Sequence, residues 1–212
     1  RAFARRMTAF LREEMKCRAL VANMNSWTYP AAYQVPRGEE YDYVDDHFYV
    51  DHPRFLGGGW RLPSRCENGN PLAYANRGVD WNESARRADR PFTISEWNFS
   101  APGRFRGAAG LLFGAGAALQ DMDGVWRFAW SHSRDWLLKD GAIGYFDTAV
   151  DPLMQAGERA MIALYLRGDM PVDRSVVNPF AKSASIRADK EKGVFVVETD
   201  RTCGVFAEPS DV

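Results

Sequence analysis

The strongest constraint on the fold is an alternation of strand-like and helix-like segments along most of the chain. Four short runs have the apolar, β-branched and aromatic composition of buried strands, and each is followed by a helix-like segment or a long irregular stretch. These runs span residues 19–25, 41–50, 91–98 and 124–130. Strands that alternate with helices pair in parallel through crossover connections. The sequence therefore predicts an α/β fold, either an open doubly wound sheet or a closed barrel.

Three segments have the periodicity or the end signals of helices. Apolar residues recur at helical spacing over residues 2–16, and this helix is already under way at Arg1, which predicts that the chain is a fragment. Small apolar residues dominate a second helix over residues 105–120. A third helix is predicted to begin at Asp151, a capping residue followed by proline, and to stop at Gly168.

Two stretches depart from the alternation. Residues 51–89 are rich in Gly, Pro, Asn and Arg, which predicts a long loop with one short helix near residues 82–88. Loops of this size in a compact domain are usually functional. Beyond residue 171, three strand-like runs predict a β appendage or the start of a small β unit. We therefore expect an α/β domain over residues 1–171 and a β unit over residues 172–212.

Charge and composition argue against several classes of partner. The net charge is -1 and no basic stripe is present, which argues against nucleic acid and anionic membranes. The sequence contains no run of eighteen apolar residues, which is about the length that a bilayer-spanning helix requires. No glycine-rich phosphate loop follows a strand, and the three Cys and three His have no metal-ligand spacing. We expect neither a metal nor a cofactor. The sequence does not indicate the cellular compartment, since an export signal would lie upstream of Arg1.

Polar and aromatic side chains gather where the predicted strands end, which is where parallel α/β folds form their active sites. The candidate site residues are Asn25, Trp27, His47, Tyr49, Glu96, Trp97, Asn98, Trp130 and His132. Indole and phenol faces stack on sugar rings, while carboxylates and amides bond hydroxyl groups. The sequence therefore predicts a carbohydrate ligand.

Glu96 is the most informative of these residues. A buried apolar strand runs directly into it, and burial of a carboxylate is costly unless the group is paired or hydrogen-bonded. One interpretation is a catalytic carboxylate at the mouth of the fold. The other is a structural glutamate that caps a helix or bonds an arginine.

Three segments resemble strands of clan A glycoside hydrolases. Residues 90–98 resemble the seventh barrel strand, whose terminal glutamate is the nucleophile. Residues 46–49 resemble the sixth strand, and residues 125–130 the eighth, in which a tryptophan forms the floor of the sugar site. The resemblance implies that residues 1–168 are the C-terminal half of a (β/α)8 TIM barrel. It also implies that residues 20–25 form the fifth strand.

The resemblance implies a retaining glycosidase that cleaves O-glycosidic bonds of an oligo- or polysaccharide. Glu96 would be the nucleophile, Tyr49 or His47 would hold its carboxylate, and Trp130 would stack under the sugar. In this clan the acid/base is a glutamate at the end of the fourth strand, which would lie before Arg1. We therefore expect this chain alone to hydrolyse no glycoside.

Other interpretations stay open. A non-catalytic carbohydrate-binding or scaffold protein could use the same barrel without a second carboxylate. Tyr49 and Trp130 could be core aromatics, and His47 a structural histidine. A half-barrel also leaves two open sheet edges, which predicts that an N-terminal half-barrel or a second chain covers them.

Overall fold

The computed structural model describes most of the chain. The described residues are 2–23, 37–72, 86–87, 89–138, 143–172, 176–177, 184–189, 194–199 and 206–207. The chain forms two compact units. The first comprises residues 1–47, 82–93 and 174–212, and the second comprises residues 48–81 and 94–173.

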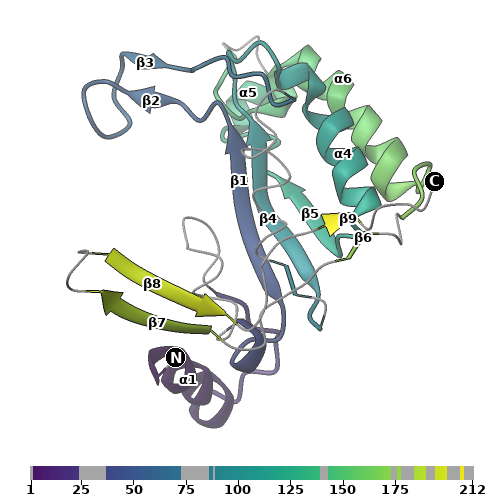
Figure 1. Cartoon of the computed structure of the whole chain (residues 1–212). Coiled ribbons are helices and arrows are strands. Elements are labelled where there is room, and N and C mark those ends of the chain that lie inside the picture. Colours follow the sequence, from purple (N-terminus) through teal and green to yellow (C-terminus); the bar gives the residue numbers. More distant parts are fainter. Residues whose placement is uncertain are drawn as a thin grey trace. The chain divides into compact units, whose positions relative to one another are not determined.

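Three parallel strands form the main sheet (Figure 1). Strand β4 (Phe92–Phe99) lies between β1 (Val44–Val50) and β5 (Gly124–Arg127). Strands β1 and β4 begin in the first unit and end in the second. Pairing continues past the strand ends, because Ser100 N donates to Val50 O at 2.9 Å. The predicted α/β class is confirmed, with strands at three of the four expected positions.

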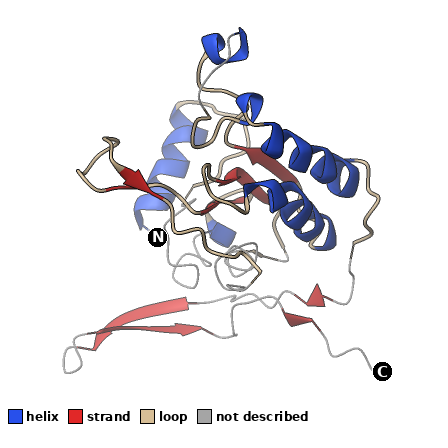
Figure 2. Cartoon of the chain, turned by 90° about the horizontal axis from the view of Figure 1, so that it is seen from above, coloured by secondary structure: helices blue, strands red, loops and turns tan. Residues whose placement is uncertain are grey.

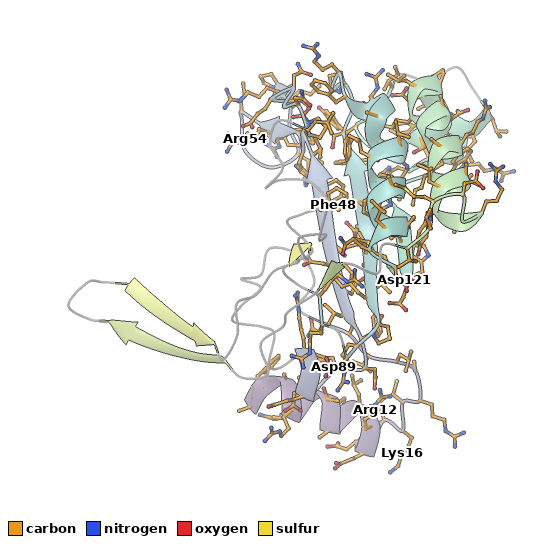
Figure 3. All side chains as sticks on the ribbon, turned by 45° about the vertical axis from the view of Figure 1, so that its right-hand side comes forward. Arg12, Lys16, Phe48, Arg54, Asp89 and Asp121 are labelled. Carbon is orange, nitrogen blue, oxygen red and sulfur yellow. The ribbon has the colours of Figure 1, made fainter. Side chains whose placement is uncertain are left out.

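Aromatic side chains pack between the sheet and helix α4 (Ala109–Leu119). Trp97 is fully buried, and its ring centroid lies 6.2 Å from that of Phe48 and 4.3 Å from that of Phe113. Figure 3 shows Phe48 within β1. Successive side chains of a strand point to opposite faces of a sheet. The inward packing of Phe48 therefore directs its neighbour Tyr49 to the face opposite α4.

Helix α4 lies beside helix α6 (Pro152–Met161), as Figure 2 shows in blue. The two backbones approach closely, because a Cβ added at Gly110 would lie 1.8 Å from Gly157 O. A 3-10 turn over Arg106–Ala108 leads into α4. The helix predicted over residues 105–120 is thereby confirmed.

The ends of α6 follow the signals seen in the sequence. The Asp151 carboxylate accepts the backbone N–H groups of Leu153 at 2.9 Å and Met154 at 3.3 Å, which satisfies two of the otherwise unpaired donors of the first turn. The helix continues through a π-helical turn over Ile162–Leu166. Gly168 then has φ +76°, the left-handed conformation that commonly ends a helix.

In the first unit, helix α1 (Ala2–Ala9) continues through a π-helical turn over Phe10–Glu14. The helix predicted over residues 2–16 is thereby confirmed. Beyond this helix, the Arg37 guanidinium is fully buried and lies 3.8 Å from the Asp46 carboxylate. A buried charge of this kind requires such a partner.

The end of the chain contains two antiparallel strand pairs. Strand β7 (Ala184–Asp189) pairs with β8 (Val194–Thr199) along its whole length. The shorter pair joins β6 (Val176–Val177) to β9 (Phe206–Ala207). The strand-like runs predicted after residue 171 are therefore confirmed as strands, and they belong to the first unit.

Two predicted strands need correction. Residues 19–23 form no strand, and the rest of the run predicted over residues 19–25 lies outside the described residues. Leu20 is 70% exposed, so apolar burial does not stabilise an extended strand there. The strand predicted over residues 124–130 ends earlier, at Arg127. Phe128 N still donates to Trp97 O of β4 at 3.0 Å, but Ala129 N donates to Phe146 O, so the chain leaves β4 at this point.

The loop predicted over residues 51–89 contains a short hairpin. Strand β2 (Arg54–Phe55) pairs antiparallel with β3 (Ser64–Arg65). Most of the helix predicted near residues 82–88 lies outside the described residues, and residues 86–87 are not helical.

The sequence did not predict helix α5 (Arg134–Leu138), because five residues are too few to show a periodicity. None of the helices in the described part of the chain has the length and hydropathy that a bilayer span requires. Cys17 and Cys66 are free thiols, and Cys203 lies outside the described residues.

Candidate functional site

A hydrogen bond between neighbouring strands joins the two central residues of the candidate site. The Tyr49 hydroxyl of β1 donates to Glu96 Oε2 of β4 at 2.7 Å. Burial raises the pKa of Tyr49 far above its usual value, and the hydrogen bond and charge of Glu96 raise it further. Tyr49 therefore keeps its proton, and it orients the Glu96 carboxylate as a charge-assisted donor.

Three rings surround the Tyr49 phenol. The ring centroids of His52 and Phe146 each lie 5.4 Å from that of Tyr49, and the Phe128 centroid lies 6.3 Å away. All three contacts are edge-on, a favoured geometry for aromatic pairs. These rings cover part of the phenol, and partial shielding of this kind strengthens the hydrogen bond between Tyr49 and Glu96.

His132 lies at the border of this ring cluster, with its centroid 5.0 Å from that of Phe128. Its Nδ1 is 3.0 Å from Asp147 Oδ1, and Asp147 is buried. In the neutral ring, a carboxylate beside Nδ1 favours the tautomer in which Nδ1 carries the proton and Nε2 is an acceptor. The His132 side chain is 42% exposed, so a ligand hydroxyl can reach this acceptor.

A polar pocket of about 550 Å³ opens beside Tyr49. Its lining residues are Tyr49, Val50, Asp51, His52, Arg54, Glu67, Gly69, Asn70 and Pro71. Arg54, labelled on the hairpin in Figure 3, donates to Glu67 Oε1 at 3.2 Å. Burial raises the pKa of Asp51, while the N–H of Gly69 at 3.0 Å opposes the rise. The pocket therefore offers donors and acceptors that can bond hydroxyl groups.

The sequence predicts that Trp97 and Asn98 contact the ligand, but both side chains are fully buried. They support the site from the core instead. Asn98 Nδ2 donates to Phe128 O at 2.6 Å and to Phe146 O at 3.0 Å. The Arg127 guanidinium lies 4.1 Å from the Trp97 ring centroid and donates to Asn98 Oδ1 at 2.7 Å. Asn98 thereby fixes the backbone at Phe128 and Phe146, whose rings lie beside the Tyr49 phenol.

The remaining predicted residues are not part of the described cluster. His47 lies in β1 with its Nε2 3.8 Å from Asp45 Oδ2. Trp130 is 59% exposed, and no ring contact joins it to another aromatic residue in the described part of the chain. Asn25 and Trp27 lie outside the described residues.

Sequence reasoning missed Phe128, Phe146 and His52 as members of the cluster. Phe128 precedes Trp130 by two residues, so strand alternation could have selected both. Phe146 follows no predicted strand, and His52 lies in the predicted loop. Neither residue carries a local signal, because their positions depend on contacts between distant segments.

No group of three or more His, Cys, Asp or Glu side chains among the described residues is arranged to hold a metal ion. In comparisons with known proteins, no family model, curated protein or solved structure matches this chain. The function is therefore inferred from the geometry around Glu96.

Proposed function

We propose that this chain carries the nucleophile of a retaining glycoside hydrolase that cleaves O-glycosidic bonds of an oligo- or polysaccharide. The main support is the 2.7 Å hydrogen bond from Tyr49 to Glu96 within a cluster of aromatic rings. A phenol orients a carboxylate without adding a positive charge, which preserves its nucleophilicity. The resemblance of residues 90–98 to the seventh strand of clan A hydrolases supports the same role.

In the proposed reaction, a Glu96 carboxylate oxygen attacks the anomeric carbon and forms a glycosyl ester. The bond from that carbon to the leaving oxygen breaks, and the acid/base residue gives this oxygen a proton. Water then attacks the anomeric carbon, and the acid/base residue takes the proton from the water. Glu96 departs as a carboxylate, and two inversions retain the configuration.

The proposed fold is the C-terminal half of a (β/α)8 barrel, with β1, β4 and β5 as its sixth, seventh and eighth strands. The acid/base carboxyl group has to lie about 5–5.5 Å from Glu96. By resemblance to the clan, it belongs to a strand that would precede Arg1. The outer edges of β1 and β5 pair with no other strand in the described residues. We propose that an N-terminal half-barrel or a second chain covers them.

The side chains around Glu96 suit a sugar better than an apolar ligand. His132 Nε2 can accept a hydrogen bond from a hydroxyl group, and Arg54 and Glu67 supply a donor and an acceptor in the adjacent pocket. The nearby ring of Phe128 offers an apolar surface for the C–H groups of a sugar. The proposed reaction uses no metal and no cofactor.

Covalent labelling of Glu96 tests the proposal. We would incubate the chain with a panel of 2,4-dinitrophenyl 2-deoxy-2-fluoroglycosides, whose leaving group departs without a proton from an acid. The expected result is a mass increase of one fluorosugar, which peptide mapping places on Glu96. Glu96→Gln keeps the size of the side chain and should take up no label.

Two results would contradict the proposal. One is an adduct on a different residue in both proteins. The other is the absence of an adduct from every probe, and saturable binding of oligosaccharides in that case would indicate a non-catalytic carbohydrate-binding protein.

A further inference from the structure

The hairpin β2–β3 carries an exposed tryptophan close to the candidate site. Trp60 is 67% exposed and lies in the turn between the two strands. The turn contains Gly58 with φ +75° and Gly59 with φ +58°, conformations that favour glycine. Figure 1 shows this hairpin beyond the C-terminal end of β1. Parallel α/β folds form their sites at that end of the sheet.

The hairpin is held in place at its base. The Ser64 side chain hydrogen-bonds the Tyr145 hydroxyl, and the Phe55 ring makes an edge-on contact with the Tyr145 ring at 5.7 Å. Tyr145 directly precedes Phe146, one of the rings around Tyr49. The strands that hold Trp60 are therefore anchored next to the candidate site.

Ring contacts connect Trp60 to the candidate site. Its centroid lies 5.6 Å from that of His52 and 6.2 Å from that of Phe146, and both of these rings contact Tyr49 directly. A closer, tilted contact joins Trp60 to Phe55 at 4.9 Å. None of the three contacts is a parallel stack. Together with the high exposure, this geometry leaves an indole face available to a ligand.

The surroundings of Trp60 suit a sugar ring. An exposed indole next to a polar site is a common mark of a ligand surface. His52 contacts the indole and also lines the polar pocket, together with Arg54, Glu67 and Asn70. Indole faces bind the C–H face of a sugar, while nearby polar groups bond its hydroxyls. The pocket and the indole supply both kinds of contact.

We infer that Trp60 is the stacking platform for a second sugar ring, adjacent to the ring that reacts with Glu96. The inference rests on the proposed glycosidase function and narrows the substrate to a chain of at least two sugars. Trp60 is then a specificity-determining residue that favours oligosaccharides over monosaccharide glycosides.

The test compares short and long sugars in the wild-type chain and in Trp60→Ala. The first measurement is the rate at which a fluoromonosaccharide probe and the matching fluorodisaccharide probe label Glu96. The second is the affinity of the labelled protein for a monosaccharide, which binds on the opposite side of the reacting ring and needs no general base to do so. We expect either a preference for the longer probe or binding of the monosaccharide, and Trp60→Ala should weaken that preference or affinity roughly tenfold.

Matched variants separate stacking from folding. Trp60→Phe retains an aromatic face and should keep most of the preference. Leu62→Ala removes another exposed side chain of the same hairpin, which is 76% exposed, and should change neither measurement. Equal probe preferences and equal monosaccharide affinities in wild type and Trp60→Ala, with Glu96 labelled in both, would overturn the inference alone. Absence of label in every protein would overturn the proposed function, and the inference with it.

Discussion

Tyr49 acts on Glu96 through one hydrogen bond, which can be removed without changing the packing. Tyr49→Phe keeps the ring that contacts His52 and Phe146 but removes the donor to the carboxylate. A hydrogen bond to a charged group contributes about 1.5–3 kcal/mol. We therefore expect Tyr49→Phe to slow the labelling of Glu96 by about 10- to 100-fold. The labelling rate is measured by mass spectrometry.

The matched control is Tyr165→Phe in the same unit. The Tyr165 hydroxyl donates to Met122 O at 2.5 Å, away from the ring cluster, so its removal should leave the labelling rate unchanged. An equal slowing in both variants would show that Tyr49 does not orient the nucleophile specifically.

Asn98 connects the core to the rings of the site. Asn98→Ala removes both donors to the carbonyls of Phe128 and Phe146 and the acceptor for Arg127, whose charge is buried. Unsatisfied buried groups cost about 1–3 kcal/mol each. We expect the free energy of unfolding to fall by about 3 kcal/mol in urea denaturation. Asn70→Ala, at a more exposed position, should change it by less than about 0.5 kcal/mol.

At the level of elements, the packing of α4 on α6 depends on glycine. Alanine favours an isolated helix over glycine by about 1 kcal/mol. At Gly110, however, the added Cβ would lie 1.8 Å from Gly157 O. A backbone oxygen cannot relieve this contact by a rotamer change, as a side-chain atom could. Overpacking costs about 1–3 kcal/mol. We expect Gly110→Ala to lower the free energy of unfolding by about 2 kcal/mol.

Two further variants test how the loss of stability depends on the contact distance. The free energy of unfolding is measured by urea denaturation in each case. The Cβ of Gly114→Ala would lie 2.8 Å from Met161 Cα, so the loss should be smaller than at Gly110. Gly57→Ala in the hairpin meets no atom within 4 Å and should be nearly neutral. A stabilised Gly110→Ala protein would show that helix propensity outweighs the close contact.

The elements that could be predicted from sequence are those with local signals. Asp151 and Gly168 mark the ends of one helix by capping chemistry, and the apolar run before Glu96 marks a strand. The hairpin β2–β3 has strands of two residues, which are too short for a period. The run at residues 19–25 has strand composition, but Leu20 lacks the burial that would stabilise a strand.

The candidate site was predictable to the same limited extent. Glu96 and Tyr49 could be chosen because each lies at or near the end of a strand. The clan resemblance selected Trp130 as the aromatic floor of the sugar site, whereas the ring that the structure brings into contact with Tyr49 is Phe128. Which of two aromatics meets the phenol depends on the pairing of β4 with β5 and on the chain around Phe146, which no local pattern encodes.

At the scale of the whole molecule, the candidate site belongs to one unit. Tyr49, Glu96, Phe128 and His132 all lie in the second unit, while the first unit supplies the beginnings of β1 and β4. The proposed reaction also needs a carboxyl group that the clan resemblance places before Arg1. The 212-residue chain should therefore perform the first half of the reaction and stall before the second.

A burst experiment tests whether this chain performs only the first half of the reaction. With an ordinary 2,4-dinitrophenyl glycoside, Glu96 can displace the leaving group without an acid, but water then lacks a general base. We expect one equivalent of dinitrophenolate per chain, followed by negligible turnover. Azide needs no base, so it should restore turnover and give a glycosyl azide of retained configuration, because two inversions have occurred. Steady turnover without azide would show that the chain supplies its own acid/base, and an equal burst in Glu96→Gln would exclude Glu96 as the nucleophile.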